Sequence, residues 1–340
     1  MRAVVYDGPR SFSVREVPTP SAGPGEVRVR VTQTGVCGTD LHLHDGRFLA
    51  TFPLTPGHEV VGIVDQIGDG ATDLAVGEQV TVNPNASCGH CSYCRAGRFI
   101  MCPDLTGMGS NRPGAFAEYV TAPAAQVFSA EGLAPDVAVF TEPASCVMHG
   151  MDVLRPRAGS TALVIGAGPT GLLLAQLVAH GGAAHVTVAA PTAFKLDTAR
   201  ALGIDRTHQM DRGDLPGDVA ALRELSGGEG YDVVIDATGD PTVCEVCVPL
   251  TRNGGTAMFY GVTDEEDLVP VSPYDIFRRE LTIRGSFAEI SSFPPALAAL
   301  RSGRLRTDGI ITHRFPLEEY GAALEALRSD PTAHKVVMVP

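Results

Sequence analysis

Cysteines are the residues whose types and spacing most directly suggest chemistry. Four of the eight cysteines in this 340-residue chain stand within fifteen residues, in the pattern C-x2-C-x2-C-x7-C. Four thiolates so spaced can surround one tetrahedral Zn²⁺, and such a closed site stabilises structure rather than performing chemistry. An iron–sulfur site uses similar spacings, and unrelated buried thiols are a further alternative. We favour a structural zinc in a lobe at residues 83–113, held by Cys88, Cys91, Cys94 and Cys102.

A glycine-rich turn at residues 166–171 is the second chemical signature. The apolar, β-branched run 161–165 predicts a buried strand, and the apolar run 172–178 predicts a helix. A G-x-G-x-x-G turn between strand and helix is typical of a dinucleotide site, where phosphates meet the free N–H groups of the helix. The alternative is a plain tight turn. The predicted cofactor-binding residues of this turn are Gly166, Gly168, Pro169, Thr170 and Gly171.

The end of the next expected strand bears on the choice between NAD and NADP. A site that prefers NAD carries Asp or Glu about 20 residues past the glycines, where it binds the ribose hydroxyls. Here that position is Ala190, and the neighbouring Thr192 and Lys195 could bind a 2′-phosphate. Lys195 could equally be a solvated helix lysine. We therefore expect NAD(P), with a preference for NADP and dual use as the alternative.

Four further residues could bind metal, but they are dispersed in the sequence, and their spacing does not indicate that they share one site. Cys37 alone could be a core thiol, and His58 with Glu59 could belong to a turn. Glu142 could be a carboxylate at a helix N-terminus. Taken singly, most of these residues favour the structural interpretation.

The elements that must position these groups alternate from residue 161 onward. Strands and helices in turn predict an α/β fold with a doubly wound, six-stranded parallel sheet. This dinucleotide-binding domain is expected at 147–285, inserted in a discontinuous, mainly β domain formed by 1–146 and 286–340. The expected strands of the parallel sheet are 161–165, 185–190, 206–210, 232–236, 256–260 and 281–285.

The chain resembles the zinc-dependent alcohol dehydrogenases of the medium-chain dehydrogenase/reductase superfamily. The resemblance runs over essentially the whole chain and rests on GVCGTDLH (35–42), PGHEVVG (56–62), the four-cysteine lobe, TEPASC (141–146) and GAGPTG (166–171). It implies a GroES-like catalytic domain and a Rossmann domain. Glu142-Pro143, where alcohol dehydrogenases proper place a cysteine, is similar to the polyol (sorbitol- and arabitol-type) dehydrogenase branch.

The resemblance also implies a catalytic zinc, which makes two zinc ions per subunit. Cys37 and His58 match its ligands, and Glu59 matches a ligand of the polyol branch. Glu142 either ligates the zinc or holds its water. Asp40 matches the carboxylate that orients the ligand histidine. The ion would lower the pKa of the substrate alcohol.

The proton path and the substrate follow from the same resemblance. Thr39 and His42 match the relay that carries the alcohol proton to solvent, after which the carbon gives hydride to the nicotinamide. A pocket for a polyol or sugar would include His44, Arg47, Phe48 and Phe116, although those in the loop could be plain surface residues. The alternatives are a threonine or amino-alcohol dehydrogenase and, in a different class, a redox-silent dinucleotide-binding protein.

Composition limits the partners. A net charge of −13 and a pI near 5.2 argue against nucleic acid, and glycines and a proline break the most apolar region, so we expect no membrane span. The N-terminal segment lacks the apolar core of a signal peptide, and the clustered cysteines suit a reducing compartment, so we expect the cytoplasm. The strand at 281–285 would lie at a sheet edge, where pairing across subunits predicts a homodimer or homotetramer.

Overall fold

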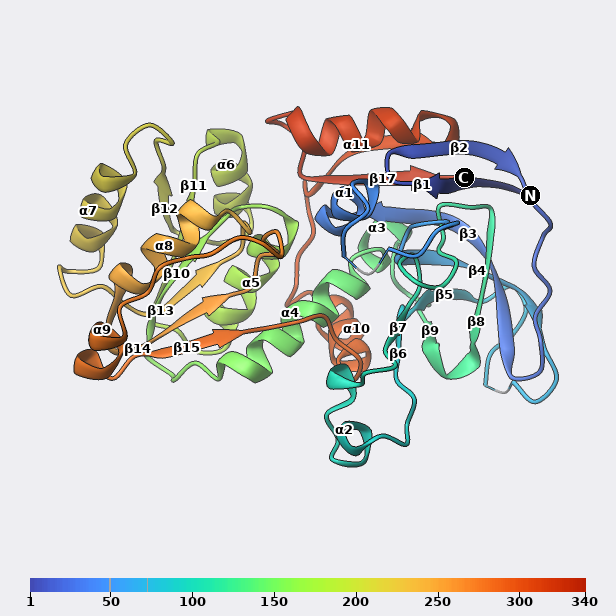
Figure 1. Ribbon diagram of the computed structural model, residues 1–340, viewed down its shortest axis with the longest axis horizontal. Coiled ribbons are helices and arrows are strands. Elements are labelled where there is room, and N and C mark those ends of the chain that lie inside the picture. Colours follow the sequence, from blue (N-terminus) through green and yellow to red (C-terminus); the bar gives the residue numbers. More distant parts are fainter. Residues whose placement is uncertain (49, 72) are drawn as a thin grey trace. The chain divides into compact units, whose positions relative to one another are not determined.

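Two compact units make up the protein in the computed structural model, which describes residues 1–48, 50–71 and 73–340 (Figure 1). Unit 1 comprises Met1–Ser145, Ala288–Gly303 and Gly309–Pro340, and unit 2 comprises Cys146–Phe287 and Arg304–Asp308. The chain therefore leaves unit 1, builds unit 2 and returns.

Unit 2 is built on a six-stranded sheet in which every pairing is parallel, in the order β12-β11-β10-β13-β14-β15. The predicted doubly wound α/β fold is confirmed. The central strands β10, β11 and β13 are rich in β-branched residues and largely buried, as expected of a sheet covered on both faces. The strands of the sheet span Thr161–Ile165 (β10), His185–Ala190 (β11), Arg206–Gln209 (β12), Tyr231–Asp236 (β13), Thr251–Phe259 (β14) and Thr282–Gly285 (β15).

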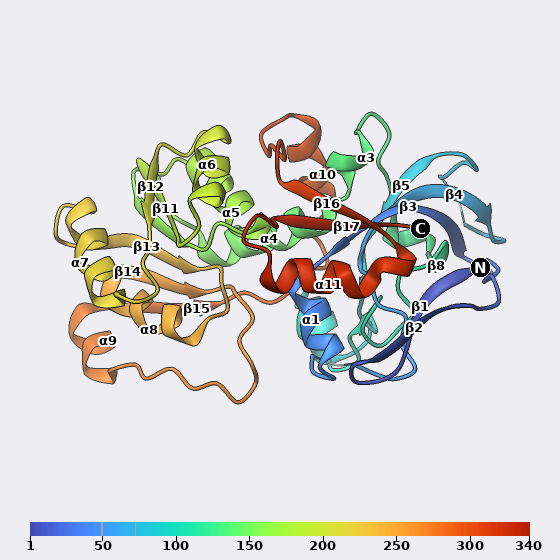
Figure 2. The ribbon, with the colours of Figure 1, turned by 90° about the horizontal axis from the view of Figure 1, so that it is seen from above.

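Helices connect these strands and cover both faces of the sheet. Figure 2 shows α5 and α6 on one side of the strands and α8 on the other. Proline in the first turn and Asp or Ser caps start several of them; Asp240, for example, accepts a hydrogen bond from Thr242 N at 3.0 Å at the start of α8. The helices are Thr141–Leu154 (α4), Pro169–His180 (α5), Ala193–Ala201 (α6), Leu215–Leu225 (α7), Pro241–Leu250 (α8) and Pro273–Arg279 (α9).

Unit 1 is mainly β. Its largest sheet runs in the order β16-β17-β3-β4-β5-β9, with β8 also paired to β3, and β1 and β2 form a separate hairpin. Its strands are Arg2–Gly8 (β1), Ser11–Glu16 (β2), Glu26–Val36 (β3), Glu59–Ile67 (β4), Gln79–Val82 (β5), Asn85–Ala86 (β6), Thr106–Gly107 (β7), Tyr119–Pro123 (β8), Val127–Ser129 (β9), Ile311–Pro316 (β16) and Lys335–Val339 (β17).

Short helices complete unit 1. Two buried valine-rich and aromatic clusters, one around Val29 and one around Tyr6 and Tyr320, form its core. The helices are Gly38–His44 (α1), Ser92–Arg95 (α2), Pro135–Ala138 (α3), Phe293–Arg301 (α10) and Tyr320–Ser329 (α11), with short 3-10 turns at Phe99–Met101 (η1), Ala124–Gln126 (η2) and Leu317–Glu319 (η3).

The chain returns to unit 1 after Phe287 but contributes one further short segment to unit 2. Residues 304–308 group with unit 2, because the Gln176 side chain bonds both the N–H and the carbonyl of Arg306. Across the described ranges, none of the helices has the length and apolar character that a membrane crossing requires.

Candidate active site and metal centres

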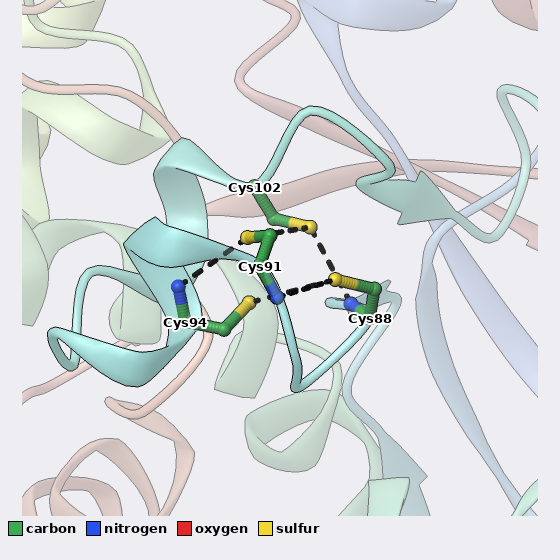
Figure 3. Close-up of side chains that lie close together, drawn as sticks. All are labelled: Cys88, Cys91, Cys94 and Cys102. Atoms are coloured by element: carbon green, nitrogen blue, oxygen red, sulfur yellow. Dashed lines mark hydrogen bonds between the residues drawn. The ribbon is translucent and has the colours of Figure 1, made fainter.

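The four clustered cysteines converge at the lobe (Figure 3). Their ligand atoms all lie within 4.8 Å of one another, with sulfur–sulfur distances of 4.0 Å for Cys88 and Cys94 and 3.9 Å for Cys91 and Cys102. Sulfurs at the corners of a zinc tetrahedron with bonds of about 2.3 Å stand about 3.8 Å apart. The donor set and its spacing therefore fit zinc.

Backbone N–H groups donate hydrogen bonds to these sulfurs. Cys91 N donates to the Cys88 sulfur and Cys94 N to the Cys91 sulfur, each at 3.4 Å, and Cys91 caps α2. Hydrogen bonds of this kind favour the thiolate, and the backbone N–H of His90 leads the groups that lower the pKa of Cys88. None of the eight cysteines, which all lie in the described ranges, forms a disulfide, as a metal lobe rather than a disulfide framework requires.

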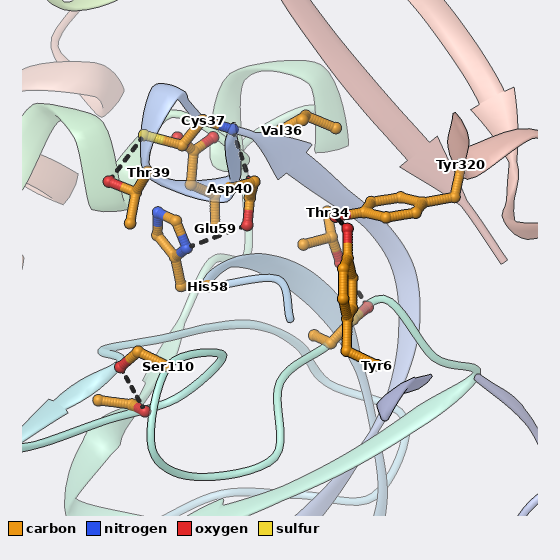
Figure 4. A network of polar contacts seen from close by, with 12 residues as sticks. Tyr6, Thr34, Val36, Cys37, Thr39, Asp40, His58, Glu59, Ser110 and Tyr320 are labelled. Atoms are coloured by element: carbon orange, nitrogen blue, oxygen red, sulfur yellow. Dashed lines mark hydrogen bonds and ion pairs between the residues drawn. The ribbon is translucent and has the colours of Figure 1, made fainter. Parts of the chain in front are cut away.

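A second group brings together residues from two strand ends. Cys37 follows β3, and His58 and Glu59 stand at the start of β4 (Figure 4). The antiparallel register pairs Gly35 with Glu59, so the end of one strand meets the start of the other. The ligand atoms of Cys37, His58 and Glu59 lie within 4.8 Å of one another. One thiolate, one imidazole and one carboxylate form a donor set that zinc favours, and three protein ligands leave a position for substrate.

Asp40 joins this group to the start of α1. Its Oδ2 accepts a hydrogen bond of 2.8 Å from Cys37 N, which caps the helix, and its Oδ1 lies 3.9 Å from His58 Nδ1. Burial raises the pKa of Asp40 to about 6, although His58 opposes the shift. Burial lowers the pKa of His58, but Cys37, Asp40 and Glu142 outweigh it and raise that pKa well above its usual range. The surroundings of His58 are thus strongly negative, as suits a divalent cation.

Lys335 is a charged member of the site that the sequence analysis missed. Its Nζ lies 2.7 Å from both carboxylate oxygens of Glu59, and the two side chains are 4% and 1% exposed. Gly35 makes room for this pair, because a Cβ there would overlap Glu59 Oε2. Burial lowers the pKa of Lys335, but Glu59 and Cys37 outweigh it and raise the pKa. The available signal was a lysine at the start of the apolar strand KVVMV.

Glu142 lies in the first turn of α4 and is 8% exposed. Its charge reaches both His58 and Lys335, so it belongs to the same electrostatic environment. Glu289 is a second carboxyl group that sequence reasoning missed. It is fully buried, and burial followed by the charge of Glu142 raises its pKa to about 8. Its place in SFAEISSF carries no periodic signal that would have found it.

The expected relay residues lie on one face of α1. Thr39 and His42 are three residues apart and both are half-buried. The Thr39 hydroxyl lies 3.7 Å from the Cys37 sulfur. Both side chains are therefore on the helix that begins at the candidate metal ligand.

The glycine turn has the backbone geometry expected of a phosphate-binding loop. Gly166 has φ of 116°, and Gly168 precedes α5, whose first residue is Pro169, with Thr170 next. A Cβ at Gly171 would overlap the Gly166 carbonyl, so the helix packs closely on the turn. A Cβ at Gly168 would have no neighbour within 4 Å. The turn is thus open on the side where a phosphate would approach.

The residues expected around the adenosine ribose stand at the end of β11. Ala190 is 1% exposed, and its carbonyl accepts a hydrogen bond from Met210 N. Thr192 is the N-cap residue of α6, where its side chain makes no capping bond, and Lys195 lies one turn into that helix. Both are half-buried.

The residues expected in the substrate pocket lie in different surroundings. His44 Nδ1 is 2.8 Å from the Tyr6 hydroxyl, inside an aromatic cluster. Phe116 is fully buried in the core and packs against Tyr320. Arg47 is exposed and Phe48 is half-buried with φ of 55°. These four residues stay a prediction.

Comparison with known proteins agrees with this geometry. Residues 23–132 match the alcohol dehydrogenase GroES-like domain, and residues 169–302 match the zinc-binding dehydrogenase family. D-arabinitol dehydrogenase 1 of Uromyces fabae is 42% identical over 97% of this chain and 94% of its own length. D-altritol 5-dehydrogenase of Agrobacterium fabrum is 35% identical over 99% and 98%. A zinc-binding dehydrogenase of Sinorhizobium meliloti bound to NADP superposes with a TM-score of 0.92 at 34% identity, covering 100% of this chain and 99% of that one.

The chain belongs to the zinc-binding, medium-chain alcohol dehydrogenase family, and it is an oxidoreductase. The expected resemblance to the polyol dehydrogenase branch is confirmed, because relatives named for two different polyols match nearly the whole chain. The interpretation as a redox-silent binding protein is set aside.

Proposed function

We propose that this enzyme oxidises a secondary alcohol of a polyol or sugar and transfers the hydride to NAD(P). The observation that carries the proposal is the group formed by Cys37, His58 and Glu59, in which three different ligand types meet within 4.8 Å. The names of the polyol dehydrogenases that resemble the chain support the substrate class.

A zinc ion held by Cys37, His58 and Glu59, with Glu142 as a fourth ligand or as the holder of a water, would supply Lewis acidity that lowers the pKa of the alcohol. Asp40 orients His58 by charge across 3.9 Å. The Thr39 hydroxyl then accepts the alcohol proton and passes it toward His42, one turn further along α1. Gly166 and Gly168 admit the pyrophosphate to the start of α5, which holds the cofactor for hydride transfer.

The cysteine lobe takes a second, structural zinc in this proposal. Four protein ligands close that site, so its ion stabilises residues 83–113 and does not meet substrate. Metal analysis of the purified protein should find about two zinc ions per chain, one for each ligand group. A wild type that holds only one zinc per chain, and keeps it when Cys37 is removed, would contradict the catalytic site.

We further propose a preference for NADP. Thr192 and Lys195 at the start of α6 would offer a hydroxyl and a cation to a 2′-phosphate, beside the positive end of the helix dipole. Lys195→Ala should lower kcat/KM with NADP about 10-fold and leave NAD nearly unchanged. Arg200→Ala on the same helix, whose guanidinium already bonds Asp197 and Thr207, is the matched control. Equal losses with both cofactors would remove the support for this preference.

The assembly we propose is a homodimer or homotetramer in the cytoplasm. Among the strands of the described ranges, β15 pairs with β14 alone, and Leu268, Tyr274 and Phe277 on the preceding segment are 90%, 68% and 79% exposed. Unpaired strand edges and exposed apolar side chains favour contact with a second copy. Eight cysteines without a disulfide among them suit a reducing compartment. Light scattering at several concentrations tests the assembly, and a monomer throughout would contradict it.

An activity screen tests the central proposal. The panel holds pentitols, hexitols, aldoses, L-threonine and simple secondary alcohols, each with NAD and with NADP. We expect the highest kcat/KM with a polyol or sugar. Highest activity with L-threonine would move the enzyme to the amino-alcohol class, and no activity with any polyol or sugar would contradict the proposal.

A further inference from the structure

Asp236, the last residue of β13, is a fully buried carboxylate surrounded by donors. Its Oδ1 accepts hydrogen bonds from Thr238 N at 2.9 Å and from the Thr238 hydroxyl at 2.5 Å. Its Oδ2 accepts from Gly239 N at 3.2 Å and from the Cys244 thiol at 3.5 Å. These four hydrogen bonds fix the carboxylate, and three of them come from the loop 237–239, so the carboxylate holds that loop in place.

That loop interlocks with the neighbouring strand ends. Ala237 N donates to the carbonyl of Ile165, the last residue of β10, and a Cβ at Gly166 would meet the Ala237 carbonyl at 2.9 Å and Thr238 at 3.0 Å. The carbonyl of Asp236 accepts from the N–H groups of Tyr260 and Gly261 beyond β14, each at 3.0 Å. The loop held by the Asp236 side chain thus packs against the glycine turn, and the Asp236 carbonyl bonds the loop that follows β14.

The position of this loop in the sheet indicates which ligand would bind beside it. The strand order reverses between β10 and β13, and dinucleotides bind in the crevice at such a switch point, across its two halves. The glycine turn after β10 serves the half that takes the adenosine side and the pyrophosphate. The loop after β13 opens the other half, which takes the nicotinamide nucleotide. Thr238 is exposed, whereas the carboxylate beneath it is buried.

We propose that Asp236 is a positioning residue for the nicotinamide half of the cofactor, acting through the loop 237–239 and not by touching the ligand. The inference rests on the proposed use of NAD(P). Cys244 completes the anchor, because burial and then the charge of Asp236 raise its pKa to about 12 and keep it a thiol donor.

The same strand offers a matched control. Asp232 lies near the opposite end of β13, where its carboxylate accepts from Thr161 N at 2.8 Å and from the Thr161 hydroxyl at 3.0 Å. Asp232 and Asp236 therefore both accept a backbone N–H and a threonine hydroxyl at opposite ends of one strand, although Asp232 is partly exposed and also pairs with Arg252. A merely structural role predicts similar consequences for the loss of either, whereas a positioning role predicts a difference in cofactor binding.

The experiment compares the whole cofactor with its adenosine half in the full-length enzyme. Fluorescence titration gives Kd for NADH and NADPH, and competition gives Kd for adenosine 5′-monophosphate and adenosine 2′,5′-bisphosphate. Asp236→Ala should weaken binding of the whole cofactor about 10- to 100-fold and change that of the adenosine fragments by less than about threefold. Asp232→Ala should lower Tm without this selective loss.

Asp236→Asn keeps the test decisive if the alanine variant does not fold. Its amide oxygen can still accept from Thr238, but its NH2 group cannot accept from Gly239 N, so we expect a smaller loss of the same selectivity. Equal losses for whole cofactor and fragment, no loss, or the same selectivity in Asp232→Ala would overturn the inference. Failure of the wild type to bind NADH or NADPH would instead overturn the proposed function.

Discussion

The two groups of metal-binding residues in unit 1 are built in opposite ways. The cysteine lobe draws four identical ligands from fifteen consecutive residues, and nearby backbone N–H groups stabilise their sulfurs. The second group, formed by Cys37, His58 and Glu59, draws three different ligands from two strand ends and sets them against the buried Lys335. A local, closed set suits stability, whereas a dispersed, incomplete set leaves room for a reaction.

The largest expected effect falls on the second group. His58→Ala should reduce kcat at least about 1000-fold, because the Lewis acid contributes several kcal/mol to the reaction. Zinc content should fall by about one ion per chain while Tm stays near the wild-type value. His180→Ala, at the end of α5, is the control. If a His58 variant without metal at this site kept its turnover, the second group would not be catalytic.

The buried ion pair of Lys335 and Glu59 should contribute to the stability of the folded protein. In protein stripped of the catalytic zinc, Lys335→Met leaves the Glu59 carboxylate buried and unpaired, which should lower the free energy of unfolding by about 3–5 kcal/mol. Denaturant titration measures this loss, and adding Glu59→Gln should recover part of it. Arg15→Met, which breaks the exposed pair with Asp7, should change the stability far less, because solvent screens that pair. If Lys335→Met and Arg15→Met lowered the free energy of unfolding equally, burial would not be what makes the Lys335–Glu59 pair important.

Loss of a cysteine from the lobe should lower the stability of the protein and leave its turnover nearly unchanged. Cys94→Ser opens a site whose metal-binding energy is folding energy, and should lower stability by roughly 2–4 kcal/mol. Tm and zinc content measure the change, and kcat per folded, zinc-loaded active site should stay within about twofold. Ser92→Ala on the exposed side of α2 is the control. Full zinc content and unchanged Tm would mean that the cysteines do not share a metal.

The smallest expected effect concerns the helix that carries Thr39 and His42. Burial lowers the pKa of His44 on α1, so the unfolded chain binds the proton more readily than the folded one. Stability from this group is present above about pH 6.5 and is lost as the pH falls through that value toward the folded pKa. His44→Gln should flatten the acid side of the Tm profile by about 1–3 °C. A steeper acid limb in the variant would contradict this sign.

Local sequence determined much of this protein. The spacing of Cys88, Cys91, Cys94 and Cys102 indicates their convergence, since a short loop cannot carry such ligands far apart. The run from Thr161 to Gly171 specifies strand, turn and helix through neighbouring residues alone, and the alternation that follows predicts the parallel sheet. The motifs shared with the zinc-dependent dehydrogenases pointed to Cys37, His58 and Glu59, although no spacing joins them.

Tertiary structure decided what depends on the meeting of distant strands. Glu59 and Lys335 are 276 positions apart, and the pairing of β17 with β3 and of β3 with β4 brings them together. The burial of Glu289 beside Glu142 and the donors around Asp236 likewise arise from packing. Side chains of this kind follow no local period, because their partners are set by the register of strands and not by neighbours in the chain.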